Sequence, residues 1–289
     1  MINFNTKIES TEDNTIKYIF DIKGQIVEFS YIDNGTNKDI ICVPCQTMCN
    51  MMCTFCHLTD HIGKIPLKDM SGEEINSGVE YIYQDLNLGS RTLLISYMGC
   101  GEALANINNV IDSMISIKNS YKNIRFGLAT MLPKKHYKSL LELTDSVISN
   151  ELPLKIHLSM HFVDDKQRKE WIPSGLDLET SLSMLTNYRD ITNNPIEVHY
   201  TIMKDVNDTP EHINKLAMLV DNQTTIKFMR FSEKENLNIE RVDEKRLEVY
   251  VKELTKSGKM VEYYKPPGDS IGSSCGVFLT ELWEVNEVL

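Results

Sequence analysis

Short apolar runs typical of β-strands alternate along most of the chain with longer amphipathic segments typical of α-helices. Strands are expected at DIICV, TLLISY, NIRFGLAT, LKIHLSM, PIEVHYTIM and TIKFMRF. Helices are expected between and after them, near residues 71–86, 107–119, 134–146, 178–190, 209–222 and 243–256. Because this alternation requires a parallel sheet with right-handed crossovers, the six units predict an α/β fold built as a partial (βα)6 barrel.

Two further β-rich runs precede this series and predict an N-terminal β-hairpin. IKYIFDI and QIVEFSYI are separated only by Lys23 and Gly24, and glycine readily adopts the positive φ of a tight turn. We therefore expect a hairpin extension over residues 1–35 and the partial barrel over residues 36–289, ending in a C-terminal extension. Ser71 followed by Glu74 predicts a capping box at the first helix of the series.

Composition and termini favour a protein of the cytoplasm with one sizeable core. The 289 residues are 42% hydrophobic, which suits a single large domain. The N-terminal stretch MINFNTKIESTEDN is polar, and no run approaches the roughly 18 apolar residues that cross a bilayer. We expect no membrane partner and a cytoplasmic location.

The charge of the chain is acidic overall but locally basic. A formal net charge of -11 disfavours indiscriminate binding to nucleic acid or anionic membrane. Between Ser113 and Leu141, however, the sequence has no acidic residue and carries Lys118, Lys122, Arg125, Lys134, Lys135 and Lys138. This basic segment is either a solvated face or the footprint of a phosphate-bearing partner.

Five of the seven cysteines lie between Cys42 and Cys56. In a reducing compartment such a group indicates metal binding or redox chemistry more than a disulfide framework. Cys49, Cys53 and Cys56 have C-x3-C-x2-C spacing directly after the strand DIICV, where strands end and functional residues gather in such folds. Three cysteines can hold an iron-sulfur cluster with one iron left open, whereas a zinc knuckle completed by Cys45 or His57 and plain core cysteines remain alternatives.

The spacing resembles the signature of radical S-adenosylmethionine (SAM) enzymes, and further stretches make the likeness closer. They are VEFSYI, CVPCQTMCNMMCTFC, YMGCGEALANINNVI, LSMHFVDDKQRKEWIP, TIMKDVNDTPEH and GDSIGSSCGVF, in this order along the chain. Each is similar to a segment of the RlmN/Cfr family of radical SAM adenine methyl synthases. The resemblance covers almost everything from Val27 to Val277.

The resemblance implies a 4Fe-4S cluster on Cys49, Cys53 and Cys56, with SAM as the second cofactor. It also implies that Cys275 is first methylated and that a radical from a second SAM then activates this methyl group, which adds to carbon 2 or carbon 8 of an adenine. Cys42 would release the product by forming a disulfide with Cys275. A carboxylate is expected nearby to accept a proton, and Glu28 stands at the family's glutamate position.

The same resemblance implies which residues contact SAM. Glu102 matches the family residue that contacts the SAM amino group, Gly99 and Gly101 would let the backbone approach closely, and Ser159 matches a further contact. Two positions depart from the family pattern. Ala129 stands where the family has a serine, and Ser232 stands where it has an asparagine, so SAM contacts are expected to differ in detail.

The predicted partner is an RNA substrate, with a reducing electron donor such as flavodoxin or ferredoxin. Family members that modify ribosomal RNA carry a helical accessory domain before the hairpin, which this sequence lacks, so a short RNA is expected rather than a large folded one. Radical methylation of a nucleotide or another small molecule is the alternative activity. A non-catalytic metal-binding scaffold is the non-enzymatic alternative, which Cys42, Glu102 and Cys275 count against. The sequence leaves the methylated carbon and the oligomeric state open.

Overall fold

The strands form one continuous sheet in which each strand lies beside its neighbour in sequence, from β1 to β10. The computed structural model describes residues 2–33, 35, 37–274 and 276–280. Neighbouring strands are antiparallel from β1 to β4 and parallel from β4 to β10. The strands are β1 Ile2–Glu9, β2 Asn14–Ile22, β3 Gln25–Asp33, β4 Lys38–Cys42, β5 Thr92–Tyr97, β6 Ile124–Thr130, β7 Leu154–Ser159, β8 Ile196–Ile202, β9 Thr225–Arg230 and β10 Val261–Tyr264.

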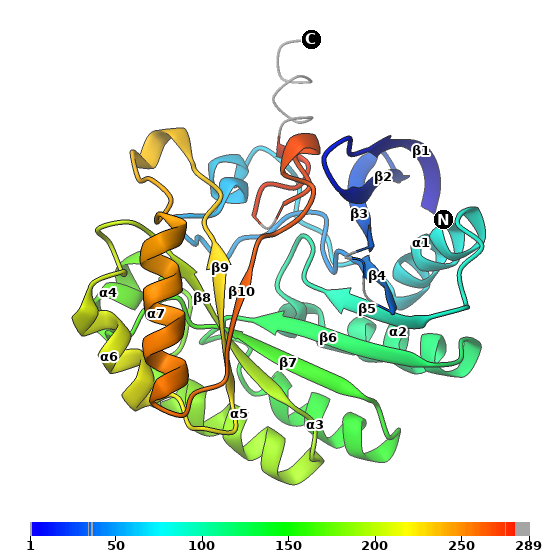
Figure 1. The fold of residues 1–289 in the computed structure, drawn as a ribbon. Helices are drawn as coiled ribbons and strands as arrows, with labels where there is room; N and C mark the ends of the chain where they lie inside the picture. Colours follow the sequence, from blue (N-terminus) through cyan, green and yellow to red (C-terminus); the bar gives the residue numbers. More distant parts are fainter. Residues whose placement is uncertain (1, 34, 36, 275, 281–289) are drawn as a thin grey trace.

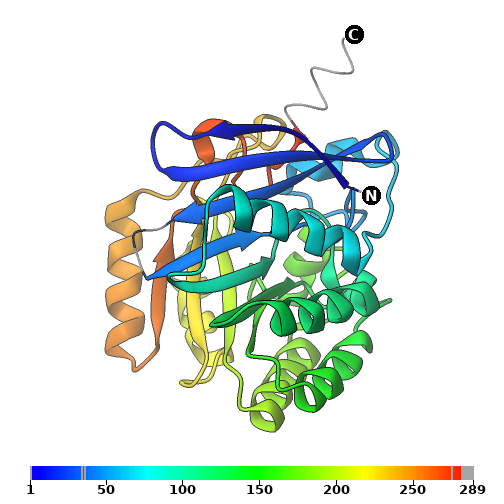
Figure 2. The same ribbon diagram turned by 90° about the vertical axis from the view of Figure 1, so that its right-hand side faces the viewer.

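The helices cover the outer face of the curved sheet (Figure 1 and Figure 2). They are α1 Gly72–Asp85, α2 Ile107–Ser120, α3 Ser139–Ser149, α4 Asp165–Trp171, α5 Leu178–Thr192, α6 Pro210–Leu219 and α7 Glu244–Lys256. Short 3₁₀ helices lie at His57–His61, Ala103–Asn106, Glu235–Leu237 and Asp269–Ile271. Among the described residues, no helix combines the length and the apolar character needed to cross a membrane.

Each parallel strand sends alternate side chains to two different environments, because successive residues of a strand point to opposite faces. On β7, Ile156 and Leu158 belong to the main hydrophobic core between sheet and helices. The residues that alternate with them, Lys155, His157 and Ser159, point to the opposite face, toward the lumen of the partial barrel. The hydrophobic core therefore lies between the sheet and the helices, whereas polar side chains occupy the lumen.

The predicted fold class is confirmed, and so are all six barrel strands and the hairpin formed by β2 and β3. The predicted capping box is also present, since the Ser71 hydroxyl accepts from the Glu74 backbone and the Glu74 carboxylate accepts from the Ser71 backbone. The domain boundary after residue 35 stays a prediction, because β1 to β3 continue the same sheet as the barrel.

The structure differs from the sequence prediction in three elements and one boundary. The strands β1 and β10 and the short helix α4 were not predicted. The helix expected from residue 134 begins only at Ser139, because residues 134–138 form turns in which Lys134 pairs with Ser174 and His136 with Pro133. β10 is only four residues long, and β1 is a largely exposed strand in a mostly polar stretch with few apolar residues, so neither gives a strong strand signal.

The segments that carry the expected chemistry meet at one end of the barrel, beyond the carboxyl ends of the parallel strands. Figure 1 shows the chain after β4, the β2–β3 hairpin and the described part of the C-terminal segment close together at this end. Two contacts fix this arrangement from distant parts of the sequence. The His57 backbone donates to the Gly276 carbonyl at 3.1 Å, and the Ser30 and Ser273 hydroxyls are 2.7 Å apart.

Candidate active site

The loop that follows β4 is fixed by the loop that follows β5. The backbone N–H groups of Cys45 and Gln46 both donate to the Cys100 carbonyl, at 2.9 and 3.2 Å. The buried Asn106 amide donates to the Cys45 carbonyl at 2.7 Å and to the Met70 carbonyl at 2.8 Å. These bonds give the cysteine loop a defined path before it reaches the motif cysteines.

A cavity lies beside this loop and brings together residues from most of the matched segments. It has a volume of about 170 Å³ and opens to solvent. Among the residues that line it are Cys49, Cys53, Cys56, Glu102, Ser159 and Gly276. The cluster motif, two predicted SAM contacts and the C-terminal segment therefore share one space.

The three motif cysteines suit a bound group that carries positive charge. Burial, together with the neighbouring cysteines, raises the pKa of Cys49 to about 12 and that of Cys53 well above its usual value. Burial raises the pKa of Cys56 to about 11, with the Lys234 ammonium acting in the opposite direction. As thiolates these groups need a compensating cation, and the iron atoms of a cluster supply one.

The spacing of the thiols favours a cluster over a single zinc ion. The ligand atoms of a tetrahedral zinc site lie about 4 Å apart, since each Zn–S bond is about 2.3 Å. Within the described part of the chain, His157, Glu197 and His199 are the one set of three ligand atoms that all lie within 4.8 Å of one another. Cys45, one proposed fourth zinc ligand, instead directs its sulfur toward the Cys100 carbonyl, 3.6 Å away.

Gly99 and Gly101 are required by the cysteine loop. A Cβ on Gly99 would lie 2.7 Å from the Val43 carbonyl oxygen, and one on Gly101 would lie 2.7 Å from the Cys45 sulfur. Gly101 also has φ +107°, a conformation that residues with a side chain rarely adopt. Close packing of the cysteine loop therefore requires glycine at both positions. Both glycines also line the cavity, where SAM is predicted to approach the backbone.

Replacement of Gly101 by alanine is expected to destabilise the protein much more than replacement of Gly24. Gly101→Ala combines backbone strain with overlap on Cys45 and Gln46, which costs roughly 2–4 kcal/mol. Gly24 has φ +83° with no atom within 4 Å of an added Cβ, so Gly24→Ala costs only about 1 kcal/mol of strain. Urea denaturation of both variants measures the difference, and equal losses would contradict this account of Gly101.

Glu102 follows these glycines and is nearly enclosed. Its Oε1 accepts from the Leu104 backbone at 3.1 Å, and its Oε2 accepts from the Met131 backbone at 3.2 Å. Burial raises the pKa of the carboxyl group, and the hydrogen bonds from Thr130, Leu104 and Met131 oppose this effect. Because Glu102 is fixed at the cavity wall, it can present a carboxylate to a cationic amino group with little reorganisation.

The other predicted SAM contacts divide into those at the cavity and one outside it. Ser159 lines the cavity at the carboxyl end of β7, and so does Ala129, which stands at the end of β6 in place of the family serine. Ser232 is absent from the described cavity wall, and its hydroxyl lies 3.3 Å from that of Ser274. In this structure Ser232 therefore contacts the C-terminal segment.

Glu28 lies in a buried polar group at the hairpin, where sequence similarity placed the family's glutamate. Its Oε1 accepts from the Ser30 hydroxyl at 3.0 Å and from the Ser273 hydroxyl. Burial raises the pKa of Glu28, opposed first by the charge of Lys17 and then by the bonds from Ser273 and Ser30. Glu28 therefore connects the hairpin to the residues just before Cys275.

Of the two predicted catalytic cysteines, only Cys42 is described by the structure, and it lies near this group. Cys42 is half-buried at the end of β4, where it pairs in register with Ser30 of β3. Cys275 lies outside the described residues, but its neighbours Ser274 and Gly276 are described. The Cys56 thiol donates to the Gly276 carbonyl at 3.6 Å, so the segment passes directly beside the cluster motif.

Sequence reasoning missed two residues that support the site. His161 lines the cavity in a left-handed conformation, and burial lowers its pKa to about 3, so its ring is neutral at pH 7. Lys234 is buried and donates to the Cys56 carbonyl at 3.1 Å and to Asp60 at 2.9 Å. His161 lies within the matched segment LSMHFVDDKQRKEWIP, which could have drawn attention to it, whereas nothing local distinguishes Lys234.

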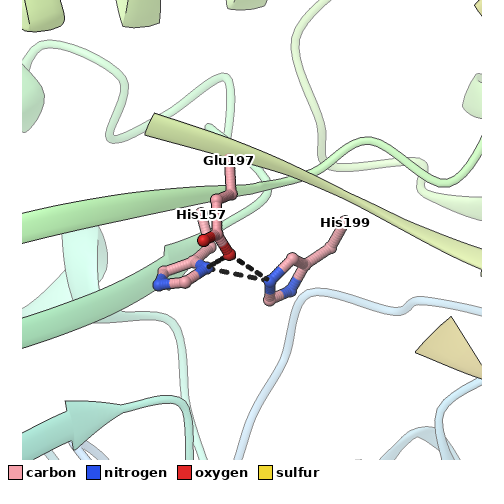
Figure 3. A group of neighbouring side chains, drawn as sticks. All are labelled: His157, Glu197 and His199. Carbon is pink, nitrogen blue, oxygen red and sulfur yellow. Dashed lines mark hydrogen bonds and ion pairs between the residues drawn. The ribbon is translucent and has the colours of Figure 1, made fainter. Parts of the chain in front are cut away.

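Sequence reasoning also missed a polar cluster in the lumen, formed by His157, Glu197 and His199 (Figure 3). His157 Nδ1 lies 2.8 Å from His199 Nε2 and 3.0 Å from Glu197 Oε2. The alternation of polar residues in KIHLS and EVHYT was a signal for it. Glu197 also binds the ammonium groups of Lys155 and Lys227. The carboxylate is thus already neutralised by two cations, which disfavours a metal ion at this position.

Curated relatives match the chain over nearly its whole length. It is 26% identical over 280 residues to a probable dual-specificity RNA methyltransferase RlmN of Endomicrobium trichonymphae, an alignment covering 93% of this chain and 77% of the relative. It is 27% identical over 277 residues to the protein of the same name from Desulforamulus reducens, covering 92% and 75%. No protein-family model matches the chain.

A solved structure shows the same fold. The crystal structure of a radical SAM methyltransferase from Sphaerobacter thermophilus superposes with a TM-score of 0.82 at 19% identity, covering 96% of this chain and 81% of that one. The resemblance inferred from the motifs is therefore confirmed: the chain is similar in sequence to the RlmN RNA methyltransferases and has the fold of a radical SAM methyltransferase.

Proposed function

We propose that this protein is a radical SAM methyltransferase that methylates an adenine carbon in RNA through a methylated Cys275. The observation that carries the proposal is the meeting of three segments at one cavity. The motif cysteines, the Gly99–Glu102 loop and the C-terminal segment all reach it. Similarity to proteins named as RNA methyltransferases supports RNA as the substrate class.

The proposed cofactors fit the residues present. Cys49, Cys53 and Cys56 would hold a 4Fe-4S cluster, while Glu102 and Ser159 would contact SAM. Bound at these residues, the cluster and SAM would supply the methyl group and the radical chemistry that an electron-poor adenine carbon requires. The proposed location is the cytoplasm, because a cluster and two catalytic thiols need a reducing compartment.

The proposed roles of the chain's own residues are covalent for the two cysteines and acid–base for Glu28. Cys275 would carry the methyl group, Cys42 would resolve the adduct by forming a disulfide with it, and Glu28 would accept a proton. The hydrogen bond from Ser273 to Glu28 supports this assignment, because it links the proton acceptor to the segment that carries Cys275. A general base must lie within hydrogen-bonding distance of the group from which it takes the proton.

The basic segment does not form one face of the molecule, so its six cations do not make a single footprint. Lys118, Lys122 and Arg125 lie at the end of α2 and the start of β6, where the parallel strands begin. Lys134, Lys135 and Lys138 follow the end of β6, on the same edge of the sheet as the cavity. Only the second group is placed to meet a substrate that enters the proposed site.

Replacing Lys134 and Lys135 together by alanine is expected to weaken RNA methylation, with no effect on a free nucleotide. Loss of two phosphate contacts should make the fall of log affinity with log salt concentration less steep, by about 1–2 in the slope. Methyl transfer to total RNA, transfer RNA and free adenine nucleotides at two salt concentrations measures this.

The matched control changes Lys122 and Arg125 to alanine. It removes the same charge at the opposite end of the strands, from side chains that are also exposed. Efficient and salt-insensitive turnover of a free nucleotide, unchanged in both double variants, would instead establish the small-molecule activity.

A further inference from the structure

The β2–β3 hairpin buries both of its faces, and the C-terminal segment covers the second one. Tyr18 and Phe29 on the first face belong to the main hydrophobic core. The opposite face carries Lys17, Glu28 and Ser30, all of them buried. Gly272, Ser273 and Phe278 of the C-terminal segment contact Lys17, Glu28 and Ser30 on this second face.

Lys17 is the charged group at the centre of this interface. Its side chain is 1% exposed. The ammonium donates to the Gly272 carbonyl at 2.9 Å and to the Phe278 carbonyl at 3.4 Å, and it lies 3.5 Å from Glu28 Oε2. The two carbonyls stand on either side of Cys275 in the sequence, so one side chain bridges both ends of the segment that contains it.

We propose that Lys17 is a positioning residue for the reaction: its ammonium group holds the segment from Gly272 to Phe278 against the buried carboxylate of Glu28. The inference rests on the proposed function for the role of Cys275 and Glu28. It extends that function, because Lys17 touches no reacting atom and acts through the residues that do.

The pattern of hydrogen bonds at Glu28 explains why a charge is needed here. Oε1 accepts from both Ser30 and Ser273, whereas Oε2 has no hydrogen-bond donor among the described residues and only the ion pair with Lys17. An apolar residue in place of Lys17 would leave the carboxylate buried without a counter-charge. Oε2 therefore keeps a lone pair that no described donor occupies, as a proton acceptor requires.

The groups around Glu28 define the expected effect of pH. Lys17 faces it from β2, Ser273 from the C-terminal segment and Cys42 from the register of β4 with β3, and Cys100 interacts with it electrostatically. Burial already raises the pKa of Glu28, and Lys17 is the strongest opposing influence. Without Lys17 the pKa should rise further, so that Glu28 becomes protonated over more of the neutral range.

The first test measures amide hydrogen exchange of peptides covering Gly268–Thr280 in the enzyme with its cluster bound. Hydrogen bonds from a charged donor each change an equilibrium by roughly tenfold or more, so Lys17→Met should speed exchange in this segment by at least about tenfold. Lys23→Met is the matched control, because Lys23 lies in the turn of the same hairpin with a side chain that is 74% exposed. It should leave the segment unchanged.

The second test measures thermal stability and methyl transfer as functions of pH. Loss of packing alone would not change their pH dependence. A carboxyl group whose pKa is raised by folding costs stability as pH rises through that pKa. Lys17→Met should therefore lose thermal stability with rising pH more steeply than wild type does. The acidic limb of its methyl-transfer profile should also move to higher pH. Lys17→Met/Glu28→Gln should lose the added pH dependence of stability while its segment still exchanges rapidly.

These outcomes separate the inference from the proposed function. If wild type transfers no methyl group, the proposed function fails, and exchange and pH-dependent stability still decide the role of Lys17. If Lys17→Met exchanges like wild type and keeps its pH profile, the inference is overturned. Wild-type protection of the segment in the double variant would overturn it too, even if the single variant failed to fold.

Discussion

Alanine at Cys49, Cys53 or Cys56 should abolish binding of the 4Fe-4S cluster and, with it, all methyl transfer. Each cysteine lines the cavity, and each would provide one of only three protein ligands. The cofactor carries the difficult chemical step, so partial activity is not expected from a protein that has lost it. Iron and sulfide analysis of anaerobically reconstituted protein, with its visible absorption spectrum, measures the loss.

The matched control for this experiment is Cys100→Ala. Cys100 is buried and packs in the same small hydrophobic cluster as Cys49 and Cys56, but it is not a proposed ligand. Its replacement should leave the iron content unchanged and cost about 1–2 kcal/mol in packing. Stoichiometric zinc in place of iron in the wild-type protein would refute the cluster and the radical chemistry together.

The second large effect is a qualitative difference between the two catalytic cysteines. Cys275→Ala should prevent methyl loading altogether, because it removes the sulfur that carries the methyl group. Cys42→Ala should load normally and then accumulate a covalent adduct between protein and substrate, because no thiol is left to release the product. Peptide mass spectrometry detects both the methyl group and the adduct.

Cys45→Ala serves as the control for this pair. Cys45 lies three residues from Cys42 but is buried beneath Gly101, with its sulfur toward the Cys100 carbonyl. It should neither block loading nor trap an adduct. An active enzyme with an unmethylated Cys275 would exclude the proposed carrier role, and release of product by Cys42→Ala would exclude Cys42 as the resolving thiol.

The sequence was sufficient for the features that depend on local patterns. The alternation of β-rich and helical runs predicted the partial barrel, because a parallel strand buried on both faces is recognisable from its own residues. The cysteine motif is likewise local, and it follows the carboxyl end of a parallel strand, as the rule for such sites led us to expect. The structure adds that the motif cysteines and Glu102 line one cavity. The capping box at Ser71 followed from two residues three apart.

Features that depend on neighbours from distant segments were not predictable. β1 has apolar residues only at Ile2, Phe4 and Ile8 in an otherwise polar stretch, and its place beside β2 depends on tertiary contacts such as that of Phe4 with Tyr81 of α1. The basic segment is continuous in sequence, yet β6 runs through it and carries its two halves to opposite ends of the barrel. The charges at Lys122 and Lys134 are therefore separated by a fold that their own positions do not reveal.

The tertiary structure also decided why particular residues are present. From the sequence, Gly101 was a residue that lets SAM approach, but the fold shows it packed against Cys45 as well. Lys17 reads as an ordinary polar residue of a hairpin until the C-terminal segment, more than 250 residues later, covers it and supplies two carbonyl acceptors. The alternation of strand and helix patterns along the sequence was enough to predict the barrel, because each strand is recognisable from its own residues. The burial of Lys17 beside Glu28, by contrast, arises only when the two ends of the chain meet in the folded protein.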